Sequence, residues 1–138
     1  MAIVGLSLRD INANFDESVV ATDNINVNSS PTITNVSKRD IPLYNLKDLL
    51  SVEFVFKTTY EPKVGSISME GEVLYQVDNA KEIVSKWKKD KQIEANLATE
   101  ILNAIFRKCL TQAIMLAHEL RLPPPIMFPV VQPRREDE

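Results

Sequence analysis

The chain has 138 residues, a formal net charge of −3, and 44% hydrophobic and 25% charged residues. These values describe a soluble globular protein, long enough for one domain built around one core. The weakly acidic balance excludes a general attraction to phosphate backbones, and three glycines are too few for a phosphate-cradling loop. Binding of nucleic acids and of nucleotides is therefore disfavoured.

The only cysteine is Cys109, so the chain cannot form an internal disulfide, which fits a reducing compartment. Residues 1–5 contain no basic segment, and no apolar run approaches the roughly 20 residues that a membrane span requires. We expect a cytoplasmic protein that is neither exported nor inserted into a membrane.

The first predicted element is a strand over residues 3–15. Val4, Leu6 and Leu8 alternate with glycine or polar residues, and the apolar phase then slips by one residue. A β-bulge near Asp10 explains this slip.

A polar segment rich in asparagine follows over residues 16–31, and we interpret it as a long turn. Its alternation at residues 24–28 also allows a short edge strand. Residues 32–37 contain β-branched side chains and form a modest strand candidate.

Residues 50–60 and 64–77 are two strongly β-type runs separated by a short segment with a proline, which predicts an antiparallel hairpin. One face of the first run carries Phe54 and Phe56. The second run has one apolar face and one polar face, a pattern typical of a sheet with one covered side. A helix is therefore expected to pack on this sheet.

Two helices are predicted after the hairpin. The first covers residues 81–89, with Asn79 and Glu82 as a capping pair and Trp87 on the buried side. The second runs from about residue 95 to residue 121 and ends before a proline run, because the residue preceding a proline disfavours helix.

The second helix is unusually apolar: 16 of the 26 residues from Leu97 to Leu122 are Leu, Ile, Ala, Phe, Met or Cys. Its polar face is a narrow row at helical spacing, consisting of Glu100, Asn103, Arg107, Thr111 and His118. Ile114 interrupts this row where water is expected, with Met115 beside it. Something should therefore cover the helix at this point.

The proline-punctuated segment after the helix supplies three candidates for this cover, Ile126, Met127 and Phe128. These side chains can fold back over Ile114 within the same chain, or another subunit or ligand can occupy the site. Since prolines prevent a full strand ladder, the segment should lie over the surface as an extended, removable arm.

Catalytic chemistry finds little support. Cys109 and His118 are separated by nine residues on one helix, so their side chains point about 180° apart and only an intersubunit pair is conceivable. Glu70 and Glu72 share a strand face that is best interpreted as solvated. One histidine and one cysteine cannot form a structural zinc site, and we expect no metal, cofactor or catalytic residue.

Five lysines surround Trp87 in the first helix and form the one basic patch of the chain, namely Lys81, Lys86, Lys88, Lys89 and Lys91. Lysines that pair with phosphates beside a stacking aromatic would suit a nucleic acid. However, Glu82 and Asp90 reduce the patch to a net charge of +3, and helical spacing turns Trp87 inward. We interpret the patch as a solvated helix face.

Two stretches and the order of elements resemble the SecB family of export chaperones. The strand with Arg9-Asp10-Ile11 is similar to the bulged first strand of that family. Phe106-Arg107-Lys108-Cys109-Leu110-Thr111, followed by a proline-containing tail, is similar to its long C-terminal helix and exit. The resemblance covers most of the chain in the order of elements, although its motifs are short.

The resemblance implies a single α+β domain, which we assign to residues 1–131. The composition of the charged end of the chain predicts a disordered tail over residues 132–138. The domain would contain a four-stranded antiparallel sheet with a short and a long helix packed on one face. It also implies dimers of dimers that bind unfolded polypeptide in apolar grooves. SecB proteins are more acidic than this chain, and its basic helix has no counterpart in the acidic surface by which they dock on the export motor. SecB-like chaperones that attend toxin–antitoxin pairs show that the fold is reused for other clients.

We therefore predict a non-enzymatic SecB-like chaperone that holds unfolded polypeptide or a specific protein client, as a homodimer or homotetramer. The expected binding residues are Phe54, Phe56, Ile114, Met115, Ile126, Met127 and Phe128. The alternative is a homo-oligomeric scaffold or specific-partner adaptor without general chaperone activity.

Overall fold

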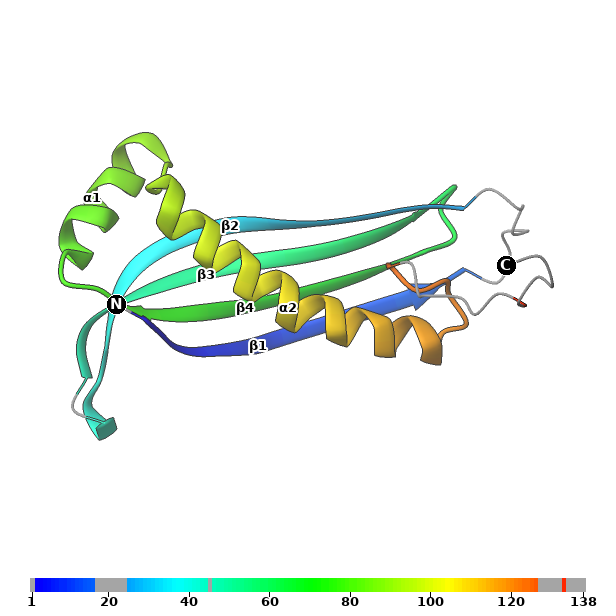
Figure 1. Ribbon diagram of the computed structural model, residues 1–138, viewed down its shortest axis with the longest axis horizontal. Coiled ribbons are helices and arrows are strands. Elements are labelled where there is room, and N and C mark those ends of the chain that lie inside the picture. Colours follow the sequence, from blue (N-terminus) through cyan, green and yellow to red (C-terminus); the bar gives the residue numbers. More distant parts are fainter. Residues whose placement is uncertain (1, 17–24, 45, 127–132, 134–138) are drawn as a thin grey trace.

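The computed structural model describes residues 2–16, 25–44, 46–126 and 133 (Figure 1). The elements follow in the order β1 (Ala2–Phe15), β2 (Asn26–Ile41), the 3-10 turn η1 (Pro42–Tyr44), β3 (Leu46–Glu61), β4 (Gly65–Gln76), α1 (Ala80–Asp90) and α2 (Ala95–Glu119). The strands form one antiparallel sheet in the order β1-β4-β3-β2. The predicted α+β fold, with a four-stranded antiparallel sheet and two helices, is confirmed.

Strand β1 contains the bulge predicted near Asp10. Its register against β4 shifts between Leu8 and Asp10, which leaves Arg9 as the extra residue. A bulge re-aims the side chain at its centre, and Arg9 reaches across the sheet to ion-pair with Glu53 on β3. A second irregularity, between Ile3 and Gly5, has no signal in the apolar pattern.

The prediction of a turn through residues 16–31 is wrong for its second part. Strand β2 begins at Asn26 and pairs with β3 along its length, with Pro31 opposite Phe56. Strand β2 lies at the edge of the sheet, so one side of its backbone forms no hydrogen bonds with a neighbouring strand. It therefore tolerates a proline and several asparagines. Residues 17–24 lie outside the described part of the chain.

The hairpin of β3 and β4 is confirmed, with pairs from Leu50 and Tyr75 at one end to Tyr60 and Gly65 at the other. Gly71 in β4 lies where neighbouring strands approach closely. A Cβ atom there would stand 2.3 Å from the Ser7 carbonyl oxygen and 2.9 Å from the Phe54 ring, so only glycine fits without a shift of the backbone.

Helix α2 lies diagonally across the sheet and contacts all four strands, whereas α1 lies at one end against β2 and β3 (Figure 1). A row of buried residues at helical spacing faces the sheet from α2: Leu97, Ile101, Ile105, Cys109, Ala113 and Ala117. The small residues at the C-terminal end of this row allow α2 to approach the strands closely. Within the described residues, neither helix combines the length and apolarity needed to cross a membrane.

Helix α1 agrees with its prediction except at its cap. Asn79 is the N-cap residue, but its side chain makes no capping hydrogen bond, so the predicted capping pair with Glu82 is wrong. Trp87 is buried against the core as predicted, and the Lys91 ammonium lies 5.4 Å from the centre of its ring. The indole is therefore not available to stack on a base.

Candidate functional site

The chain reverses direction after α2, and this turn determines what lies over the helix. The helix ends at Glu119, and Arg121 adopts a left-handed conformation with φ of 59°. The Leu122 amide then donates to the Ala117 carbonyl oxygen at 2.8 Å, which closes the turn. Leu122 is buried, so the following segment starts from a fixed point on the core.

The Tyr60 hydroxyl provides a second fixed point. It donates a hydrogen bond of 2.7 Å to the Pro123 carbonyl oxygen, joining the end of β3 to the segment that leaves α2. Burial raises the pKa of Tyr60 from 10.0 to about 12, so the hydroxyl remains a donor into the alkaline range as well as at neutral pH.

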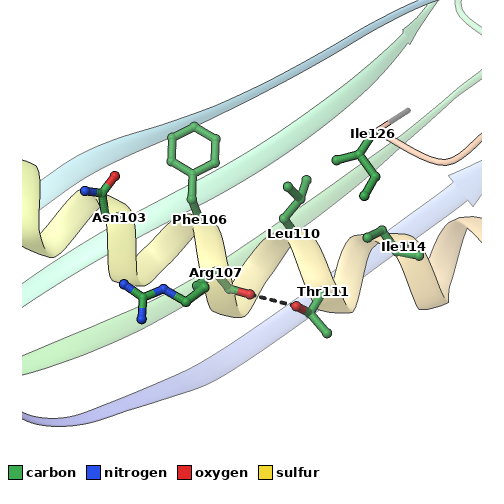
Figure 2. A pocket seen from close by; sticks show the side chains of 7 residues that line it. All are labelled: Asn103, Phe106, Arg107, Leu110, Thr111, Ile114 and Ile126. Carbon is green, nitrogen blue, oxygen red and sulfur yellow. Dashed lines mark hydrogen bonds between the residues drawn. The ribbon is translucent and has the colours of Figure 1, made fainter. Parts of the chain in front are cut away.

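A hollow of about 440 Å³ lies on the outer side of α2 (Figure 2). We call it the α2 groove; it is lined by Asn103, Phe106, Arg107, Leu110, Thr111, Ile114 and Ile126. Figure 2 shows Ile126 on the returning segment, beside Leu110 and Ile114 of the helix. Thr111 donates to the Arg107 carbonyl oxygen at 2.8 Å, so this hydroxyl is satisfied within the helix.

A second hollow of about 450 Å³ lies further along the helix and is lined by Ile114, Met115, His118, Glu119, Leu122 and Pro124. Ile114 lines both hollows and therefore lies where they meet. Met115 is 60% exposed, a large value for a methionine in a folded domain. The two hollows form an apolar surface interrupted by single polar groups. Such a surface suits a polypeptide without requiring a particular sequence.

The structure brings together three of the predicted binding residues, Ile114, Met115 and Ile126. It does not bring Phe54 or Phe56 to this surface: both are fully buried between the sheet and the helices. Phe56 packs edge-to-face against Phe106, with ring centres 5.6 Å apart. This contact connects Phe56 to the α2 groove through Phe106.

The predictions for Met127, Phe128 and the charged tail cannot be compared with the structure. Met127 and Phe128 lie outside the described residues, and so does the tail of residues 132–138 except Pro133. The described arm is therefore the segment from Leu122 to Ile126.

Sequence reasoning missed several lining residues that follow the same helical rule as Ile114. Phe106 and Leu110 precede Ile114 at steps of four, so a helical projection of α2 places all three along one stripe. Phe106 is 36% exposed although it is aromatic. The spacing of four residues between these apolar side chains is the signal in the sequence that identifies them.

Cys109 and His118 occupy different environments. Cys109 is fully buried, and this burial raises the pKa of its thiol to about 11, whereas His118 is exposed. A buried thiol with a raised pKa stays protonated near neutrality and is a poor nucleophile. Cys109 is therefore a core residue of α2.

These raised pKa values predict alkaline sensitivity. The ordinary values are 9.0 for Cys109 and 10.0 for Tyr60, so the unfolded chain releases both protons before the folded chain does. The free energy of unfolding should therefore fall as the pH rises from about 9 to about 12. Urea titrations across this range provide the measurement. Cys109→Ala and Tyr60→Phe should each flatten part of the decline, and an unchanged slope in both variants would contradict the assignment.

The sheet face opposite α2 differs from the prediction of a solvated carboxylate pair. Glu70 is exposed, but Glu72 is 3% exposed and its carboxylate is held by three groups. Arg9 donates to it at 2.7 Å, the Ser51 hydroxyl donates at 2.6 Å, and Arg39 forms a further ion pair with it. This arrangement connects strands β1, β2, β3 and β4 through one side chain, and its groups satisfy each other.

Comparison with known proteins identifies the class of fold. No family model matches the chain, and no curated protein matches it significantly. Among solved structures, the chain shares the fold of SecB-like chaperones.

One matching structure is the Mycobacterium tuberculosis Rv1957 SecB-like chaperone in complex with a ChAD peptide from the Rv1956 HigA1 antitoxin. The TM-score is 0.60 with 14% sequence identity, over 96% of this chain and 91% of that chain. The SecB-like fold implied by the sequence resemblance is therefore confirmed.

Proposed function

We propose that the protein is a non-enzymatic, SecB-like polypeptide-binding chaperone that holds an extended, non-native segment along the outer side of α2. The carrying observation is the apolar stripe of Phe106, Leu110 and Ile114, which lines two adjoining hollows on a helix face where water is expected. A helix buries its apolar residues on one face, so a second apolar stripe marks an interaction surface.

The shared fold supports this proposal, because the matching chaperone is bound to a peptide. Exposed Met115 suits a client of variable sequence, since its flexible, polarisable side chain adapts to different partners. We also propose that the protein is a homodimer or homotetramer. The unfolded polypeptide or specific protein client would be the other partner, with no cofactor required.

Ile114→Asp tests the binding surface, because it places a charge where the two hollows meet. Fluorescence anisotropy with an unstructured, labelled peptide rich in leucine and phenylalanine should show affinity about tenfold weaker than in the wild type. Leu43→Asp is the matched control, since Leu43 is 85% exposed on η1 and lines neither hollow. Equal affinities for Ile114→Asp and the wild type would contradict the proposal.

Chaperone activity requires a separate measurement. Stoichiometric protein should suppress the aggregation of several chemically unfolded clients, and Ile114→Asp should do so less effectively. If the folded wild type leaves the aggregation of every client unchanged, general chaperone activity is excluded.

The second candidate is a homo-oligomeric scaffold or specific-partner adaptor. Its supporting observation is on β1, the edge strand of the sheet, where Val4 is 42% and Ile11 is 47% exposed. Apolar side chains on an edge strand favour association. Light scattering with a hydrophobic dye separates the candidates, because a closed oligomer that binds no dye supports the scaffold and dye binding blocked by peptide supports the chaperone.

A further inference from the structure

One side of the α2 groove is formed by a side chain from outside the helix. Six of its lining residues belong to α2, whereas Ile126 belongs to the returning segment. Ile126 is 36% exposed, so the groove covers it only in part. The segment that delivers it, Pro123 to Ile126, is apolar and belongs to no helix or strand, as expected of a bound client.

The segment is fixed at its start by two contacts. Leu122 is buried and hydrogen-bonded to Ala117, and Pro123 accepts from Tyr60. Within the described chain, no hydrogen bond holds Pro124, Pro125 or Ile126. Prolines have no amide hydrogen, so detaching this part exposes no amide donor at either proline.

We propose that Pro124–Ile126, which lines the α2 groove through Ile126 and the second hollow through Pro124, is an intramolecular cover of this apolar surface, which a client must displace before it can bind there. This inference rests on the proposed function, and it adds regulation of the same surface. The resident segment lowers the apparent affinity for clients and shields the groove when no client is present. Fixing at Pro123 keeps the segment close enough to return when the client leaves.

The expected change in client affinity follows from the equilibrium between the docked and the detached segment. The apparent dissociation constant equals the intrinsic one divided by the fraction of molecules with an open groove. The segment docks mainly through one partly covered isoleucine, so it is held weakly. Releasing the segment should therefore tighten client binding about three- to tenfold.

Two variants of the full chain test the inference by different routes. Ile126→Ser weakens the seated side chain itself. Tyr60→Phe removes only the hydroxyl that fixes Pro123, and Tyr60 is 1% exposed and lines neither hollow. The same labelled peptide should bind more tightly to both variants, with the smaller gain for Tyr60→Phe. Leu43→Ser, a matched loss of an exposed apolar side chain, should leave the affinity unchanged.

The outcomes distinguish this inference from the proposed function. Weaker binding by Ile126→Ser with unchanged binding by Tyr60→Phe would overturn the inference, because Ile126 would then be part of the client site. Absence of peptide binding in every protein would overturn the proposed function. In that case methyl NOEs between Ile126 and Ile114 decide whether the segment is seated, and their absence in the wild type would also overturn the inference.

Discussion

Phe56→Ala is expected to lower the free energy of unfolding by about 3 to 5 kcal/mol, the largest effect of any substitution considered for this protein. Phe56 is fully buried beneath α2, and its ring packs edge-to-face against Phe106 at an angle of 84°. Truncation would remove the apolar surface of the ring and leave a cavity between sheet and helix. Urea denaturation should show the loss directly, and the melting temperature should fall by roughly 10 to 20 °C.

The matched control is Phe106→Ala, which removes the other ring of the same pair from a position that is 36% exposed. It should cost only about 1 to 2 kcal/mol, because part of that ring already meets water. The double variant should show a coupling of about 0.5 to 1.5 kcal/mol between the rings. If Phe56→Ala kept wild-type stability but lost peptide binding, Phe56 would be a client contact, as the sequence alone suggests.

The contrast between Phe56 and Ile114 shows what the sequence can decide. Alternation along β3 places Phe54 and Phe56 on one face of the sheet, and the structure agrees. Alternation does not say whether a helix covers that face at these positions, since this depends on where α2 crosses the sheet. For Ile114, the helical projection and the polar residues around it are enough to place the side chain on the outer face of the helix. Both belong to one continuous element, so no long-range contact has to be known.

Strand β2 shows a limit of a different kind. Asparagine, serine and proline are depleted in strands on average, but the average mixes central and edge strands. Residues Asn26 to Pro31 pair with β3 on one side only, with Asn28 opposite Thr59 and Pro31 opposite Phe56. Only the strand order, a long-range property of the chain, shows that β2 is an edge.

Glu72 illustrates the same limit for side-chain chemistry. Its strand position correctly places it on the face opposite α2, and a carboxylate on such a face is expected to meet water. Its partners Arg9 and Arg39 are 63 and 33 residues away in the sequence, so no local pattern connects them. The bulge that directs Arg9 is visible in the sequence, but its target is not.

Arg39→Ala is expected to lower the free energy of unfolding by about 2 kcal/mol. Glu72 has a side chain that is 4% exposed, so the carboxylate depends on its partners for the stabilisation that water would otherwise supply. Without Arg39, it retains only Arg9 and the Ser51 hydroxyl. The expected loss is below the 3 to 5 kcal/mol typical of a broken buried pair, because the Arg39 side chain is 49% exposed.

Lys38→Ala is the matched control on the same strand. Lys38 pairs with Asp48 at 3.3 Å, but their side chains are 42% and 70% exposed, so its loss should change stability by less than about 0.5 kcal/mol. Adding Glu72→Gln to Arg39→Ala should recover part of the lost stability, because a neutral amide is less costly to bury than a carboxylate that has lost one of its two guanidinium partners. Equal urea midpoints for Arg39→Ala and Lys38→Ala would mean that Glu72 is already satisfied by Arg9 and Ser51. A double variant less stable than Arg39→Ala alone would show that the carboxylate stabilises the sheet even without its second guanidinium.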